Sequence, residues 1–95
     1  MEMIRSFSDK RTVAIFTSRA VRGFPARIQK RAHAKLLMLD AAVQLDDLRI
    51  PPDHRLEALR GSRRRQHSIR IYGQWRICFD WFDGDVWDEE IVDYH

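Results

Sequence analysis

Two runs of alternating apolar and polar residues, separated only by Gly73-Gln74, constrain the fold more than any other feature of this sequence. In residues 69–71 and 75–81 the isoleucine, phenylalanine and tryptophan residues fall at every second position. A period of two places successive side chains on opposite faces of a β-strand, and glycine at the first position of a two-residue connection suits a type II′ turn. The runs therefore predict a β-hairpin with one core face, and Arg70 and Arg76 fall on the opposite face.

Two helices are predicted before this hairpin. Residues 9–17 form a short one, and a longer amphipathic helix starts after Pro25, because proline fits the first helical turn. The helix is expected from about Ala26 to Ala42. Apolar residues on one of its faces recur at spacings of three and four, which is typical of a helix packed on a core: Ile28, Ala32, Leu36, Leu39 and Val43.

Short extended segments are expected around these elements. Residues 4–7 alternate and predict a first strand. Residues 45–53 predict an extended surface connector, because the two adjacent prolines exclude a helix interior and a central strand. Residues 54–59 are interpreted as a strand, Asp83-Gly84 predicts a second hairpin turn, and residues 88–94 predict the last strand.

The expected elements follow the order β-α-α-β-β-β-β. Consecutive hairpins favour an antiparallel sheet, so the predicted fold class is α+β, with two helices packed on one side of a mainly antiparallel sheet. Ninety-five residues suffice for a single small domain over 1–95. No apolar run is long enough to span a membrane, and the first residues lack the apolar segment of a signal peptide. The single cysteine, Cys78, excludes an internal disulfide framework, and the cytoplasm is the expected compartment.

Charge is divided unequally along the chain. All 17 Lys and Arg residues lie within residues 1–76 together with 7 acidic residues, whereas residues 77–95 hold 7 acidic residues and no Lys or Arg. Fourteen of the bases are arginine, whose guanidinium binds phosphate through paired hydrogen bonds and stacks on bases. A basic surface for a nucleic acid is the favoured interpretation, and an ordinary arginine-rich surface is the alternative.

Several catalytic motifs are absent from the sequence. There is no glycine-rich phosphate loop, no nucleophile elbow and no helix-turn-helix pattern. The four histidines lack the spacing of metal ligands, and one cysteine cannot build a zinc site, so neither a metal nor a cofactor is expected. The chain ends on Tyr94-His95, an aromatic hydroxyl and an imidazole that can stack on bases or move protons.

Four segments closely resemble the HigB toxins, also called plasmid maintenance system killer proteins, of the RelE/ParE superfamily: residues 55–61, 66–71, 74–79 and 92–95. The similarity runs the full length, since residues 4–7 and 35–42 also fit. The resemblance implies a RelE-like fold and the toxin of a type II toxin–antitoxin system. It implies an mRNA interferase that cuts messenger RNA on the translating ribosome, where a 2′-hydroxyl attacks the adjacent phosphate and leaves a 2′,3′-cyclic phosphate.

The resemblance also implies which residues carry the chemistry. Arg76 matches the arginine that faces the scissile phosphate, and Arg60 stands where family members often have Lys or Arg. Asp93, Tyr94 and His95 match the catalytic C-terminal group. His95 can act either as acid or as base in proton transfer, and the two roles are left unassigned. Trp75 is interpreted as a core residue, with base stacking as its alternative.

Two positions depart from the family pattern. Glu57 stands where some HigB toxins have a histidine, so it either replaces that histidine in proton transfer or takes no part. Arg65 stands where many relatives have a glycine, and it adds charge to a turn that meets ribosomal RNA. The residues expected to bind RNA or the ribosome are basic: Arg63, Arg64, Arg65, Arg70, Lys30 and Arg31.

The partners implied by the resemblance are a HigA-type helix-turn-helix antitoxin, the ribosome with its rRNA, and messenger RNA. Operator DNA would be reached only through the antitoxin, and no membrane is involved. Two alternatives remain open. A ParE-like poison of gyrase would bind protein without RNA chemistry, although the ending Tyr94-His95 argues against that branch. A catalytically weak relative that binds ribosomes or their assembly intermediates is kept open by Glu57.

Overall fold

The described part of the chain forms two α-helices, two 3₁₀ helices and one antiparallel sheet. This computed structural model describes residues 6–7, 10–17, 19, 21–58 and 66–93. In chain order the elements are α1 (Lys10–Phe16), α2 (Ala26–Ala41), η1 (Leu45–Arg49), η2 (Pro52–His54), β1 (Glu57–Ala58), β2 (Gln66–Tyr72), β3 (Trp75–Phe82) and β4 (Asp85–Asp93). The strands lie in the order β1-β2-β3-β4, which confirms the predicted α+β fold. Among the described residues, no helix is long and apolar enough to cross a membrane.

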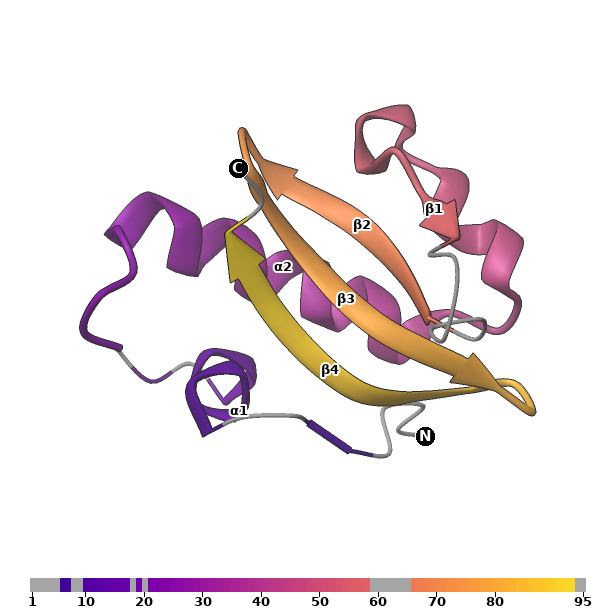
Figure 1. Cartoon of the computed structure of the whole chain (residues 1–95), viewed down its shortest axis with the longest axis horizontal. Coiled ribbons are helices and arrows are strands. Elements are labelled where there is room, and N and C mark those ends of the chain that lie inside the picture. Colours follow the sequence, from indigo (N-terminus) through magenta and orange to yellow (C-terminus); the bar gives the residue numbers. More distant parts are fainter. Residues whose placement is uncertain (1–5, 8–9, 18, 20, 59–65, 94–95) are drawn as a thin grey trace.

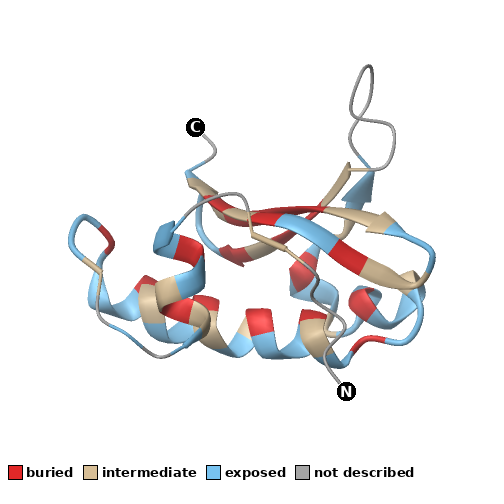
Figure 2. Ribbon diagram, turned by 90° about the horizontal axis from the view of Figure 1, so that it is seen from below, coloured by how far each residue is buried: buried red, intermediate tan, exposed pale blue. Residues whose placement is uncertain are grey.

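The α2 helix and the sheet form two layers. In Figure 1, α2 runs behind β2, β3 and β4, and Figure 2 shows the buried residues gathered between the helical layer and the sheet. Removal of apolar surface from water stabilises this arrangement. The opposite side of the sheet, called the open face below, is covered by neither α1 nor α2. The core between the layers contains Ala32, Leu36, Leu39, Ile69, Ile71, Ile77, Phe79, Val86 and Ile91.

The N-terminal part of the chain covers the outer edge of β4. Phe7 forms a parallel bridge with Glu89, and the Thr12 hydroxyl in α1 accepts a hydrogen bond from the Ile91 backbone N–H at 3.1 Å. An uncovered strand edge would present unpaired backbone groups to other chains. Of the strand predicted over residues 4–7, the structure describes residues 6 and 7 alone.

Both hairpin turns have the backbone conformation that their residues predict. Gly73 has φ +56°, as the first central position of a type II′ turn requires. Asp83 and Gly84 have φ +55° and +78°, and positive φ at both central positions is the requirement of a type I′ turn. These two turns fix the register of β2 on β3 and of β3 on β4.

Leu45–Arg49 and Pro52–His54 form two 3₁₀ helices, so the prediction of an extended connector over residues 45–53 was wrong. The Asp47 carboxylate accepts the backbone N–H of Gln44 at 2.9 Å and of Val43 at 3.0 Å, and these bonds lower the pKa of the carboxyl. They cap the start of η1. Proline is compatible with the first turn of η2, because the N–H that it lacks would have no partner there.

Two further boundaries differ from the prediction. Val43 follows the end of α2 and is 69% exposed, so it does not belong to the core face. A strand was expected over residues 54–59, and within the described residues 54–58 of that range Glu57–Ala58 alone pairs with β2. Arg55 interrupts the extended backbone with a left-handed φ of +46°, and the buried His54 ring is bonded through Nδ1 to the η1 backbone at 3.1 Å.

Candidate active site

Arg76 is the central residue of the candidate site, on the open face of the sheet. It lies in β3 and is only 7% exposed. Its Nε donates a hydrogen bond to Ser68 Oγ at 2.9 Å, and its Nη2 donates to the Arg55 carbonyl at 2.7 Å and to the Ser68 carbonyl at 3.2 Å. Because these bonds fix the planar guanidinium, the rest of its donors point in a defined direction.

Glu57 lies near Nη1, the third nitrogen of the Arg76 guanidinium. Arg76 Nη1 is 4.0 Å from Glu57 Oε1, and the Glu57 side chain is 56% exposed. The sheet brings the two together, since Glu57 in β1 pairs with Ser68 in β2, the residue that accepts the Arg76 Nε–H. None of the three bonds described above uses Nη1. A phosphate oxygen can therefore approach Nη1 beside a carboxylate that is able to accept a proton.

Arg70 extends the basic part of the open face, as the alternation predicted. The register pairs Arg70 directly with Arg76 across β2 and β3. Arg70 is partly exposed, and its Nε donates to the Gly73 carbonyl at 3.2 Å. Like charges opposite each other on neighbouring strands repel, so an anion bound between these two arginines relieves an unfavourable interaction.

Asp93 is the described member of the predicted C-terminal group. It is exposed, ends β4 and pairs with Trp75, whereas its neighbour Val92 pairs with Arg76. Successive strand residues alternate between faces, so Asp93 falls on the side of β4 opposite to that of Arg76, at the same end of the sheet. Three other predicted catalytic residues lie outside the described residues: Arg60, Tyr94 and His95.

Two of the predicted RNA-binding residues, Lys30 and Arg31, lie away from the open face on which Arg70 pairs with Arg76. Lys30 and Arg31 are exposed on α2, in the helical layer behind the sheet. The Arg31 guanidinium carbon lies 4.6 Å from the centre of the Tyr72 ring, and that of Arg27 lies 5.9 Å from it. Arg63, Arg64 and Arg65 lie outside the described residues.

The two groups that hold Arg76, the Ser68 side chain and the Arg55 carbonyl, were not predicted from the sequence. Ser68 shares its strand parity with Arg70, so extending the alternation by one step would have placed it on the arginine face. The Arg55 carbonyl reaches the guanidinium from a backbone with φ +46°. No pattern of side chains signals that conformation, because Arg55 is a residue type that rarely adopts it.

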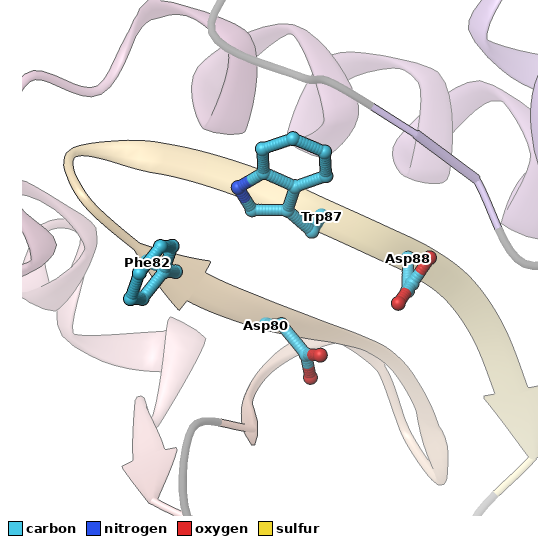
Figure 3. A pocket seen from close by; sticks show the side chains of 4 residues that line it. All are labelled: Asp80, Phe82, Trp87 and Asp88. Atoms are coloured by element: carbon cyan, nitrogen blue, oxygen red, sulfur yellow. The ribbon is translucent and has the colours of Figure 1, made fainter.

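A pocket of about 330 Å³ lies at the β3–β4 end of the sheet. Figure 3 shows the side chains of four described residues that line it: Asp80, Phe82, Trp87 and Asp88. Its two carboxylates repel phosphate, so this pocket is unsuited to RNA. Nor does the described part of the chain contain a cluster of three His, Cys, Asp or Glu side chains able to hold a metal ion.

Comparison with known proteins agrees with the resemblance. Residues 5–95 match the family model described as the RelE-like toxin of type II toxin–antitoxin system HigB. Toxin HigB-1 of Vibrio cholerae is 45% identical over 60 residues, which are 63% of each chain. Endoribonuclease HigB of Proteus vulgaris is 31% identical over 93 residues, which are 98% of this chain and 100% of that protein. An uncharacterised protein of Haemophilus influenzae is 32% identical over 62 residues.

Proposed function

This chain belongs to the HigB family of RelE-like toxins of type II toxin–antitoxin systems, and we propose from that premise that it is an endoribonuclease that cuts messenger RNA on the translating ribosome. The relative from Proteus vulgaris carries the name of an endoribonuclease. The observation that carries the proposal is the fixed guanidinium of Arg76, whose Nη1 faces Glu57 on the open face of the sheet.

In the proposed reaction, a ribose 2′-oxygen attacks the adjacent phosphorus. The O2′–P bond forms and the P–O5′ bond breaks, which leaves a 2′,3′-cyclic phosphate and a 5′-hydroxyl. Arg76 Nη1 donates to a non-bridging oxygen as negative charge grows on it, and Arg60 adds positive charge. The proton leaves the 2′-hydroxyl and another reaches O5′ through the candidate acid–base groups: Glu57, Asp93, Tyr94 and His95.

As a toxin of a type II system, the chain has an antitoxin partner. We assign this partner to the HigA type with a helix-turn-helix, so that operator DNA is reached only through the antitoxin. Residues 1–95 act as one toxin domain in the cytoplasm. The basic residues outside the active site are assigned to contacts with messenger and ribosomal RNA: Arg63, Arg64, Arg65, Arg70, Lys30 and Arg31.

The test is a map of RNA breaks made by the purified protein on a defined messenger, with and without translating ribosomes. We expect breaks within the messenger only when ribosomes are present, and 3′ ends that carry a cyclic phosphate. Removal of His95 is expected to reduce the breaks, because the terminal imidazole takes part in proton transfer.

Two outcomes would change the assignment. Breaks that persist at the full rate without His95, and are lost in Glu57→Gln, would move the proton transfer from the tail to Glu57. Intact messenger together with arrested growth of cells that express the protein would overturn the endoribonuclease and direct the search to gyrase or to ribosome assembly.

A further inference from the structure

A second pocket, of about 300 Å³, lies between the start of α2 and the β2–β3 turn. We infer that it binds one unstacked base of the substrate RNA, close to the nucleotide that is cut, and this inference rests on the function proposed above. The pocket is at the lower end of the size range of small-molecule sites, which suits a single base. It is lined by Pro25, Arg27, Ile28, Tyr72, Gln74 and Trp75.

Two aromatic rings form the walls of this base pocket. Tyr72 is 42% exposed, and Trp75 is partly buried against Phe24, with ring centres 5.2 Å apart and planes at 81°. The edge-to-face contact fixes the indole. Proteins hold the bases of single-stranded RNA by stacking them on such rings, and the Gln74 amide at the rim can bond to a base edge.

Basic side chains surround the pocket. The guanidinium groups of Arg27 and Arg31 lie over the Tyr72 ring, 5.9 and 4.6 Å from its centre, and Lys30 is exposed on the same helix. The first turn of α2 contains no acidic residue, so its positive dipole end is not neutralised by a carboxylate. A base in the pocket would therefore bring its flanking phosphates against cationic groups.

The pocket is held in shape by Gln29. Its Nε2 donates to the Val21 carbonyl at 2.8 Å and to the Phe24 carbonyl at 2.7 Å, while its Oε1 accepts the Val21 backbone N–H at 3.0 Å. These bonds fasten the segment before α2 to the helix. They place the Phe24 ring against Trp75, so the walls are formed before a ligand binds, which reduces the entropic loss on binding.

The acidic pocket in Figure 3 is a useful comparison, because it also contains exposed aromatic rings. It has a similar volume of about 330 Å³ and two exposed rings, Phe82 at 49% and Trp87 at 38%. Among the described residues that line it, the charged groups are the carboxylates of Asp80 and Asp88. The two pockets therefore differ in charge and not in aromatic surface, and only the base pocket suits a polyanion.

The position of Trp75 connects the base pocket to the substrate strand. Trp75 precedes Arg76 in β3 and pairs with Asp93 at the end of β4. Consecutive strand residues point to opposite faces, so an RNA strand that passes over the end of the β2–β3 hairpin can place one base against Trp75 and the next phosphate against Arg76. This geometry favours the substrate strand over ribosomal RNA as the source of the base.

The test measures binding of a fluorescently labelled single-stranded RNA by anisotropy in the absence of ribosomes. Its sugars carry 2′-O-methyl groups, so no free 2′-hydroxyl remains and the strand cannot be cut. We expect Tyr72→Ala to weaken binding roughly tenfold, within the range of base–aromatic stacking, and Tyr72→Phe to bind within about twofold of the wild type. Trp87→Ala is the matched control, since it removes an exposed ring from the acidic pocket, and it should leave binding unchanged. Thermal unfolding checks that each variant is folded.

A strand with an abasic position supplies a second readout. The wild type should bind this abasic strand more weakly than the intact strand. The Tyr72→Ala variant should bind the two strands with equal affinity. Binding by Tyr72→Ala at the affinity of the wild type would overturn the base pocket, even if messenger is cut on ribosomes. Binding that depends on Tyr72, without any cleavage on ribosomes, would support the pocket and overturn the proposed function instead.

Discussion

Replacing Arg76 with lysine is expected to slow RNA cleavage on the ribosome by about 10²- to 10³-fold, the range found when one preorganised donor is removed from a catalytic site. Lysine keeps the charge but has a single ammonium group. It cannot bond at once to Ser68 Oγ, to the two carbonyls of Ser68 and Arg55, and to a phosphate. The charge is therefore kept while its orientation is lost, and the maximal rate should fall more than the affinity for the ribosome.

The matched control is Arg70→Lys, on the same face of the sheet and directly opposite Arg76. Within the described part of the chain the Arg70 side chain makes one hydrogen bond, to the Gly73 carbonyl, and it is partly exposed, so its charge matters more than its fixed direction. We expect Arg70→Lys to cut at a rate close to that of the wild type. Single-turnover cleavage rates, with a thermal unfolding curve for each variant, make the comparison. Equal rates for Arg76→Lys and Arg70→Lys would show that Arg76 supplies only charge.

The regular parts of the fold follow from local pattern. The spacing of Ile28, Ala32, Leu36 and Leu39 predicted the face of α2 that is buried, and Asp83-Gly84 predicted a turn that needs positive φ twice. Alternation in β2 and β3 also placed Arg70 and Arg76 together on one face. These features depend on residues close together in the sequence, within one element or one hairpin, so a local pattern is enough to predict them.

The orientation of residues next to β-bulges could not be predicted from alternation, because a bulge reverses which side chains point to each face of the sheet. The register shifts between Arg70 and Tyr72, and Tyr72 lies under the arginines of α2 instead of on the open face. A second shift, between Cys78 and Asp80, accompanies a left-handed φ of +51° at Asp88. The position at which a strand accommodates the extra residue of a bulge is decided by the packing of the sheet on the helices.

The second bulge explains why an acidic residue lies in the core. In the run Asp88-Glu89-Glu90 the shift turns the middle side chain toward α2, and Glu89 is 0% exposed. Neither of its carboxyl oxygens has a hydrogen-bond partner among the described residues. Burial, with a smaller contribution from the nearby charge of Asp40, raises the pKa of Glu89 to about 9. The folded protein therefore holds this carboxyl in its protonated form at neutral pH.

Replacing Glu89 with glutamine is expected to remove a large pH dependence of stability. A raised pKa in the folded state means that the contribution of Glu89 is complete below its ordinary pKa of 4.5 and is lost as the pH rises toward about 9. Between pH 5.5 and 8 the unfolded chain releases a proton that the folded chain keeps, so the free energy of unfolding of the wild type should fall by about 3 kcal/mol through this residue. Glutamine has nearly the same shape and does not titrate.

Urea unfolding at several pH values checks this expectation, with Glu90→Gln as the matched control, because Glu90 is partly exposed and pairs with Cys78 on the open face. Both variants remove one acidic group, so every other titrating group contributes equally to the two curves. We expect the Glu90→Gln curve to follow the wild type, and the Glu89→Gln protein to become the more stable one as the pH rises. Parallel curves for all three proteins would mean that Glu89 ionises in the folded state at its ordinary pKa, and that the core at the second bulge admits water.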